Sequence, residues 1–190
     1  MPRIKQRNPV RKPSFPVYSF YDPRIPAAVV STFERSVLPY TREALTNVEK
    51  YLICNRAAEG KNGIGKFCFA RVENEGELLA IYQGKVLRDK RRLPDNSRIF
   101  EMPGSSVVVL GSEPSRFNAA DFNHSCTQSN CYYVDLPTDG LPCIGIVSKG
   151  PIEAGSELLV DYGDAYFMAR PGTVPCQCAR PAVCPKGRMF

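Results

Sequence analysis

The chain has 190 residues, a formal net charge of +6 and 43% hydrophobic residues, so it can form one domain with a substantial core. No apolar run is long enough to span a membrane, and no apolar segment follows the basic N-terminus MPRIKQRNPVRKP as in a secretory signal. We therefore expect no membrane span and no signal-dependent secretion. The eight cysteines are then expected in a reducing compartment, as thiols or metal ligands rather than disulfides.

The charge is distributed unevenly along the chain. Residues 113–164 contain eight acidic and two basic residues, a net charge of −6, whereas residues 1–50 carry +5. An acidic site attracts a basic substrate, such as a Lys/Arg-rich peptide tail, and repels a polyphosphate. Acidic residues that only fill solvated turns would give the same count, so both interpretations stay open. The basic N-terminus is compatible with a weak nucleic-acid contact or a targeting role.

The first part of the chain predicts an arm and a helix. Residues 1–23 are basic and proline-rich, which is typical of an extended arm. Apolar residues at helical spacing over 26–38 predict a short amphipathic helix, and Pro39 is expected to end it.

The remainder of the chain is typical of a mostly-β protein. Glycines punctuate an expected loop over 60–65, and one helical turn is expected over 119–122. Many short strands with Gly/Pro turns and only few short helices predict the fold class. The expected strands are residues 48–55, 66–72, 78–87, 107–110, 131–136, 144–148 and 158–160.

Two unusual segments begin about thirty residues apart. Residues 122–131 read FNHSCTQSNC and hold the only histidine, His124; residues 155–164 read GSELLVDYGD. Separately, the first is compatible with a polar turn and the second with a strand that ends in a turn. Their order, their spacing and the cysteine-rich tail after them make the combination specific. It resembles the SET-domain family of protein-lysine methyltransferases.

The resemblance extends over about residues 48–184. The segment GIGKF, with Gly63, Ile64 and Gly65, is similar to the family's Gly-x-Gly loop, and YQGK at 82–85 is similar to its YxGE-like element. On its own a loop with two glycines is usually only a turn, and no long helix follows it as in a nucleotide-binding fingerprint. The resemblance implies a SET fold of short strands and small sheets, in which the NHSC and DYG segments cross in a knot-like arrangement.

The family's activity is methyl transfer from S-adenosylmethionine to a lysine side chain, which sets two physical demands. The reacting atoms must be held in line, about 3–3.5 Å apart. The lysine must be neutral although its ordinary pKa is about 10.4, which costs roughly 4–5 kcal/mol near pH 7. A narrow apolar channel and a nearby sulfonium both disfavour the charged amine, and tyrosines suit the walls of such a channel.

The resemblance implies roles for individual residues. Tyr162 matches the catalytic tyrosine, although a tyrosine at a strand end is also compatible with a core position. Tyr82 and Tyr133 match further channel tyrosines, and Tyr133 together with Val160 is similar to the monomethylating branch. The implied cofactor-binding residues are Gly63, Ile64, Gly65, Asn123 and His124.

His124 has two other interpretations. A lone histidine is more often structural than catalytic. It could also act as general base for Cys126 in a hydrolase, but a cysteine two residues along the chain rarely faces the reactive nitrogen of the imidazole, and no other feature of a cysteine peptidase is present.

The tail contains Cys176, Cys178 and Cys184, whose spacing suits one tetrahedral metal ion that needs a fourth ligand. The resemblance implies a post-SET-like zinc site completed by Cys126, with Cys131 as the substitute. Five residues separate the last two tail cysteines, where the family usually has four. Three thiols on a tail without metal remain the alternative.

The expected organisation is an arm and helix over 1–44, a SET domain over 45–168 and a zinc-binding tail over 169–190. The chain departs from the family's RFxNHSCxPN pattern at 120–122, where Ala-Asp-Phe replaces Arg-Phe-x, and at 127–130, which hold one extra residue.

The resemblance implies a histone tail or another basic peptide as substrate, in the nucleus, or in a host nucleus if the origin is microbial or viral. The alternatives are an inactive SET-like module that binds a basic peptide or nucleic acid, and a purely structural zinc-binding domain.

Overall fold

The computed structural model describes residues 18–21, 23–57, 63–88, 99–101, 107–111, 118–163 and 166. The arm of residues 1–17 and the tail cysteines Cys176, Cys178 and Cys184 lie outside the described residues. Within the described part, no helix is long and apolar enough to cross a membrane.

One long helix and eleven strands make up the described elements, together with one 3₁₀ turn. The helix is α1 (Ala27–Lys50), and the turn is η2 (Ala119–Asp121). The strands are β1 (Tyr18–Tyr21), β2 (Cys54–Ala57), β3 (Ile64–Phe67), β4 (Leu78–Ile81), β5 (Gly84–Leu87), β6 (Ile99–Glu101), β7 (Val108–Gly111), β8 (Asn123–His124), β9 (Cys131–Leu136), β10 (Cys143–Ser148) and β11 (Glu157–Val160).

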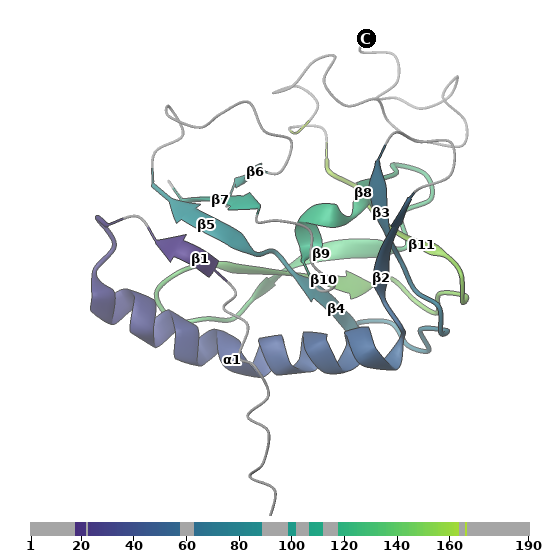
Figure 1. Ribbon diagram of the computed structural model, residues 1–190, viewed down its shortest axis with the longest axis horizontal. Coiled ribbons are helices and arrows are strands. Elements are labelled where there is room, and N and C mark those ends of the chain that lie inside the picture. The colour runs from purple at the N-terminus through teal and green to yellow at the C-terminus, as the bar shows by residue number, and fades with distance from the viewer. Residues whose placement is uncertain are drawn as a thin grey trace, which may run out of the picture.

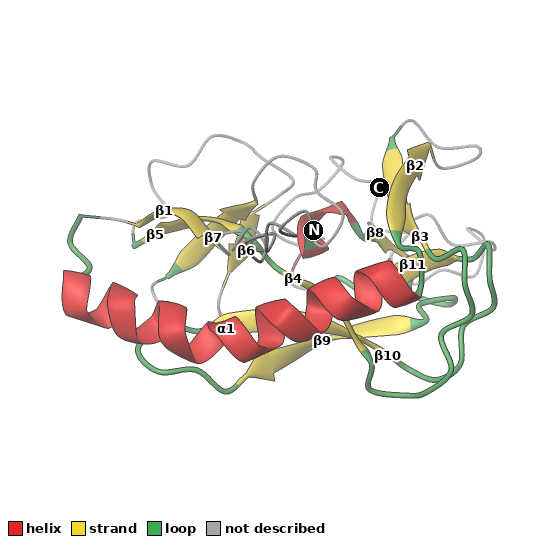
Figure 2. Cartoon of the chain, turned by 60° about the horizontal axis from the view of Figure 1, so that its bottom comes forward, coloured by secondary structure: helices red, strands yellow, loops and turns green. Residues whose placement is uncertain are grey.

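The strands form two sheets. The smaller has the order β1-β5-β7-β6, and the larger has the order β2-β3-β11-β9-β10-β4, with β8 paired to β11. In both views of the chain η2 and β8 lie between the smaller sheet and the β2–β3 pair (Figures 1 and 2). The last described strand, β11, thus joins β3 to β9 near the middle of the larger sheet.

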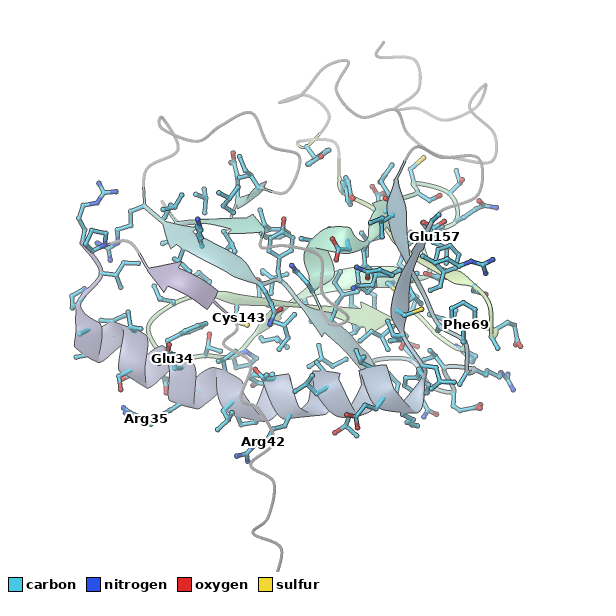
Figure 3. All side chains as sticks on the ribbon, viewed as in Figure 1. Glu34, Arg35, Arg42, Phe69, Cys143 and Glu157 are labelled. Carbon is cyan, nitrogen blue, oxygen red and sulfur yellow. The ribbon has the colours of Figure 1, made fainter. Side chains whose placement is uncertain are left out.

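Helix α1 runs along the strands of the larger sheet and packs on β4 (Figure 2). Its inward face is buried, and Asn47 on this face donates from Nδ2 to the Leu78 carbonyl oxygen at 3.0 Å. Arg35 and Arg42 point from α1 away from the strands (Figure 3) and are exposed. The buried residues of α1 are Phe33, Val37, Thr41, Ala44, Asn47 and Val48.

The expected end of this helix at Pro39 is wrong, and so is the expectation of only short helices. α1 continues through Pro39 for a total of 24 residues, and it includes the start of the strand expected over 48–55. Proline lacks an N–H and disfavours a helix interior, but Pro39 lies on the exposed side of α1. Burial of apolar residues before and after Pro39 outweighs that local cost.

The mostly-β architecture is confirmed, and several elements lie where the sequence predicts them. β9, β10, β11 and η2 agree with the expected segments to within one residue. The expected strand over 78–87 is instead two strands in different sheets, β4 and β5, separated by Tyr82 and Gln83. The strand expected over 66–72 is β3, which ends at Phe67.

Candidate functional site

The two motif segments lie side by side. β8 and β11 are parallel neighbours, with Leu159 opposite Asn123 and Val160 opposite His124. The Ser125 N–H continues this pairing and donates to the Val160 carbonyl oxygen at 2.9 Å. Segments separated by about thirty residues therefore share a hydrogen-bonded edge.

Tyr162 follows β11 and is held by the histidine-containing segment at two points. Its backbone N–H donates to His124 Nδ1 at 3.0 Å, and its hydroxyl donates to the Phe122 carbonyl oxygen at 2.5 Å. The Tyr162 and His124 rings have centroids 5.2 Å apart. Residues 122–124 thus position both the backbone N–H and the hydroxyl of Tyr162.

His124 is almost fully buried, at 2% exposure. Because Nδ1 accepts the Tyr162 N–H, a neutral imidazole carries its proton on Nε2. Asp161 Oδ1 also lies 3.6 Å from Nδ1. This geometry favours a positioning role for His124 over the general-base interpretation, in which Nδ1 would have to take a proton from a substrate or from Cys126.

A cavity of about 50 Å³ lies beside Tyr162. It brings together the three tyrosines that the sequence predicts, Tyr82, Tyr133 and Tyr162, although they come from separate elements. Phe100 of β6 bridges two of them, with ring centroids 5.0 Å from Tyr82 and 5.2 Å from Tyr133. The described residues around the cavity are Tyr82, Ile99, Phe100, Ala119, Ala120, Phe122, Tyr133, Tyr162 and Tyr166.

The cavity is an environment for neutral groups. Burial raises the pKa of Tyr133 above its ordinary value, and the neighbouring Tyr162 and Tyr82 raise it further. The Tyr133 phenol therefore stays protonated and can donate a hydrogen bond. The same apolar walls disfavour a charged amine over a neutral one. Val160, by contrast, is buried within β11 and is not among the described residues that line this cavity.

The glycine loop contacts the histidine-containing segment at Asn123. Asn123 donates from Nδ2 to Glu157 Oε1 at 2.7 Å and approaches the Ile64 carbonyl oxygen at 3.4 Å. Glu157, labelled in Figure 3, comes from β11. A Cβ atom on Gly65 would collide with Glu157 Oε1 and lie 2.9 Å from Asn123 Nδ2, whereas one on Gly63 would meet nothing within 4 Å. Of these two glycines, only Gly65 could not carry a side chain without a shift of Glu157 or Asn123.

Asn130 holds β11 with both ends of its side-chain amide. Nδ2 donates to the Glu157 carbonyl oxygen at 2.8 Å, and Oδ1 accepts from the Leu159 N–H at 2.8 Å. The departure from the family pattern at 127–130 therefore leaves an asparagine that pairs with the neighbouring motif segment.

The expected metal ligands are only partly within the described residues. Cys126 is half-buried, and its proposed partners Cys176, Cys178 and Cys184 lie outside them. No group of three or more His, Cys, Asp or Glu side chains suited to a metal occurs in the described part. Cys131 is fully buried in β9, and this burial raises the pKa of its thiol.

Sequence reasoning missed three residues of this region. Phe100 and Tyr166 contact the tyrosines of the cavity, and Glu157 holds Asn123. Glu157 could have been found, since it lies within the GSELL segment. The isolated aromatic in RIFEM carried no periodic or spacing signal for Phe100.

Comparison with known proteins gives one family and several relatives. The SET-domain family model matches residues 28–163. The histone-lysine N-methyltransferase trithorax of Drosophila melanogaster is 31% identical over 126 residues, which are 62% of this chain and 3% of the relative. The histone-lysine N-methyltransferase ASHH2 of Arabidopsis thaliana is 31% identical over 125 residues, 60% of this chain and 7% of the relative.

A third relative is nearer to this chain in length. The histone-lysine N-methyltransferase set-1 of Caenorhabditis elegans is 26% identical over 133 residues, 68% of this chain and 54% of the relative. The chain thus spans less than two thirds of the length of each of these relatives. The family model, however, includes both motif segments, the glycine loop and α1 almost entirely. This chain belongs to the SET-domain family.

Proposed function

We propose that the protein transfers a methyl group from S-adenosylmethionine to the side-chain amine of a lysine in a protein, with a histone tail as the substrate. The observation that carries the proposal is the position of Tyr162. Its backbone and hydroxyl bind residues 122–124, while its ring lines the cavity that contains Tyr82 and Tyr133. One side chain therefore connects the proposed cofactor side with the proposed lysine side.

In this proposal the cavity receives the lysine. Its aromatic walls exclude water and favour the neutral amine, which alone has a lone pair for nucleophilic attack. Tyr162 is the residue that orients this amine, Tyr82 forms part of the wall, and the protonated phenol of Tyr133 supplies a hydrogen-bond donor there.

Gly63, Ile64, Gly65, Asn123 and His124 are proposed to hold the cofactor, which supplies an electrophilic methyl group when bound. Two observations support the fit. Gly65 lets β3 approach Asn123 and Glu157 without a side chain between them, and Asn123 has a fixed amide beside that loop. Its carbonyl end remains suited to a donor such as the ammonium of the cofactor's amino-acid portion.

The net charge of residues 113–164 favours a basic substrate. The relatives named above are histone-lysine N-methyltransferases, which supports a histone tail and, with it, action in a nucleus. A weak contact of the basic N-terminal arm with nucleic acid remains part of the proposal.

A structural zinc ion is proposed at Cys126, Cys176, Cys178 and Cys184. The support is the donor set itself, since three tail thiols and a half-buried Cys126 suffice for a closed tetrahedral site. Such an ion would fix the tail to the segment that carries His124.

Monomethylation is the proposed extent of reaction. Its support is Tyr133, which lines the cavity beside Tyr162 and whose phenol would limit the room for an amine that already carries methyl groups. Mass spectrometry of a reacted histone peptide should show mainly the monomethyl product. A predominance of trimethyl-lysine would contradict this part of the proposal.

A thermal-shift measurement with S-adenosylhomocysteine, followed by an isotope-transfer assay on core histones, tests the function as a whole. The ligand should raise Tm, since it binds only the folded state, and ATP, an adenosine ligand with a polyphosphate, should not. Label should then enter lysine. Binding without transfer would favour the inactive-module alternative, and binding of neither ligand would favour the purely structural one.

A further inference from the structure

A lysine is completely buried next to the glycine loop. Lys66 follows Gly65 in β3 and is 0% exposed. Its neighbours across the sheet are Asn55 of β2 and Leu158 of β11. Since side chains alternate along a strand, Lys66 projects from the face of β3 opposite to the one on which Gly65 meets Asn123.

Lys66 lies in a compact polar cluster with Asn55 and Asp121. Its Nζ donates to Asn55 Oδ1 at 2.5 Å and lies 3.5 Å from Asp121 Oδ2. Asn55 in turn donates from Nδ2 to Asp121 Oδ2 at 3.2 Å. The side chains of the ion pair are 0% and 1% exposed, so water does not screen the attraction between them.

The cluster joins the two parts of the proposed cofactor site. Asn55 and Lys66 belong to the β2–β3 pair that carries Gly65. Asp121 ends η2, two residues before Asn123 and one before Phe122, the acceptor of the Tyr162 hydroxyl. A shift of Asp121 relative to Lys66 would therefore move the Asn123 segment relative to the glycine loop.

Stability alone does not account for a buried ion pair here. Taking both charges out of water costs several kcal/mol per ion, and well-packed apolar residues of similar volume are often equally stable. What an apolar pair cannot supply is direction, because hydrophobic contact is non-directional whereas hydrogen-bonded charges fix distance and angle. Asp121 is also one of the positions at which this chain departs from the family motif.

We propose that Lys66, Asn55 and Asp121 are positioning residues that set the separation between the Gly63–Gly65 loop and Asn123, and thereby the affinity for the cofactor. This inference rests on the proposed function of that site. The three residues act through the loop and Asn123, not by contact with the reacting atoms. The Michaelis constant for the cofactor should therefore respond to their substitution more than kcat does.

Titration calorimetry with S-adenosylhomocysteine and thermal unfolding on four proteins test the proposal: the parent, Lys66→Met, Asp121→Leu and the double variant. Each single change removes one charge of the buried ion pair and leaves the other charge buried, so Tm should fall by roughly 10 °C. The double change removes both charges and should restore Tm to within roughly 3 °C of the parent.

The dissociation constant separates positioning from stability. In the double variant it should stay at least about fivefold above that of the parent although Tm recovers. Recovery of affinity together with Tm would overturn the proposal, since the pair would then be merely structural. Arg42→Met, at an exposed cation of α1, should change neither quantity.

If the variants at Lys66 and Asp121 do not fold, Asn55→Ala provides a second test. Asn55 is half-buried and uncharged, so its loss should be tolerated, yet the dissociation constant should rise about threefold with kcat at saturating cofactor unchanged. An unchanged dissociation constant would overturn the inference. If the parent itself bound no S-adenosylhomocysteine, the proposed function would fail. If the parent bound it but the variants bound it equally well, only the positioning role would fail.

Discussion

Tyr162 is held both by its backbone N–H and by its hydroxyl. The loss of the hydroxyl alone can therefore be separated from misfolding. In Tyr162→Phe the backbone hydrogen bond to His124 remains and only the hydroxyl is lost. We expect kcat to fall by about 10²–10³-fold, as for other single hydrogen-bonding groups at a reacting centre, with S-adenosylhomocysteine still bound. Single-turnover transfer to a histone peptide measures this.

Tyr132→Phe is the matched control, because Tyr132 is the exposed neighbour of Tyr133 in β9. It should transfer methyl groups at the rate of the parent. Equal losses of transfer rate in both variants would mean that removal of either tyrosine hydroxyl lowers the rate. This result would contradict the role proposed for Tyr162.

The raised pKa of Tyr133 gives a second prediction at the residue scale. The pKa lies above its ordinary value of about 10 because of burial, so the phenol remains protonated throughout pH 7–9. The substrate lysine, by contrast, becomes increasingly neutral over the same interval. The transfer rate should therefore rise steadily from pH 7 to 9 without a descending limb, and a fall within that range would show that a cavity phenol ionises there.

Gly65 and Gly150 form a pair of variant and control. In Gly65→Ala the new methyl group displaces the Glu157 carboxylate or Asn123, and the hydrogen bond between them is lost. We expect the Michaelis constant for the cofactor to rise about tenfold. Gly150→Ala lies outside the proposed cofactor-binding residues and meets open space, so its Michaelis constant should stay within about twofold of the parent. A larger rise for Gly150→Ala than for Gly65→Ala would contradict the proposed role of Gly65.

At this scale the types and order of the tyrosines and the Asn-His pair are distinctive enough to make them candidates from the sequence, and the three tyrosines do line one cavity. It cannot predict Phe100, which joins Tyr82 to Tyr133 only after β6 has packed in the smaller sheet. Nor does it reveal the burial of Lys66, because a lysine in a strand is ordinarily solvent-exposed.

At the scale of elements, Pro39 has a measurable effect. It lies within α1 on the exposed side, so Pro39→Ala restores a helix N–H without disturbing the core. We expect the free energy of unfolding to increase by about 2 kcal/mol. Alanine favours the helix interior over proline, and this gain is partly offset because the unfolded chain becomes more flexible without proline. Urea unfolding followed by circular dichroism measures it.

Leu38→Ala, at the preceding exposed position, should change stability by no more than about 0.5 kcal/mol. Destabilisation by Pro39→Ala would indicate that the helix breaks at this residue after all. The error in predicting α1 has a clear cause: the local penalty of proline is visible in the sequence, but the burial of Ala44 and Val48 against the sheet is a tertiary effect.

The β elements were easier to predict than α1. β9 and β10 pair over their whole length, from Cys131 opposite Ser148 to Leu136 opposite Cys143, and their β-branched and aromatic residues are typical of strands. The division of 78–87 between two sheets was not predictable, because residues typical of strands occur on both sides of Tyr82 and Gln83.

For the whole molecule, the proposed zinc ion ties the tail to the domain. Removal by a chelator should lower both Tm and the methyl-transfer rate, since metal binding contributes to folded-state stability. Metal analysis of the purified protein should give one zinc per chain. Cys126→Ser should reproduce the effect, while Cys54→Ser on β2 should retain the metal. Unchanged stability and activity after chelation would exclude the site.

The position of β11 affects the synthesis of the protein. β11 is the last described strand, yet it completes the larger sheet by pairing with β3 on one side and with β8 and β9 on the other. While a ribosome is still translating residues before 157, those three partners have open edges and the pocket lacks Tyr162. A nascent chain must therefore protect these edges until nearly the full domain has emerged, and chains stalled before that point should aggregate.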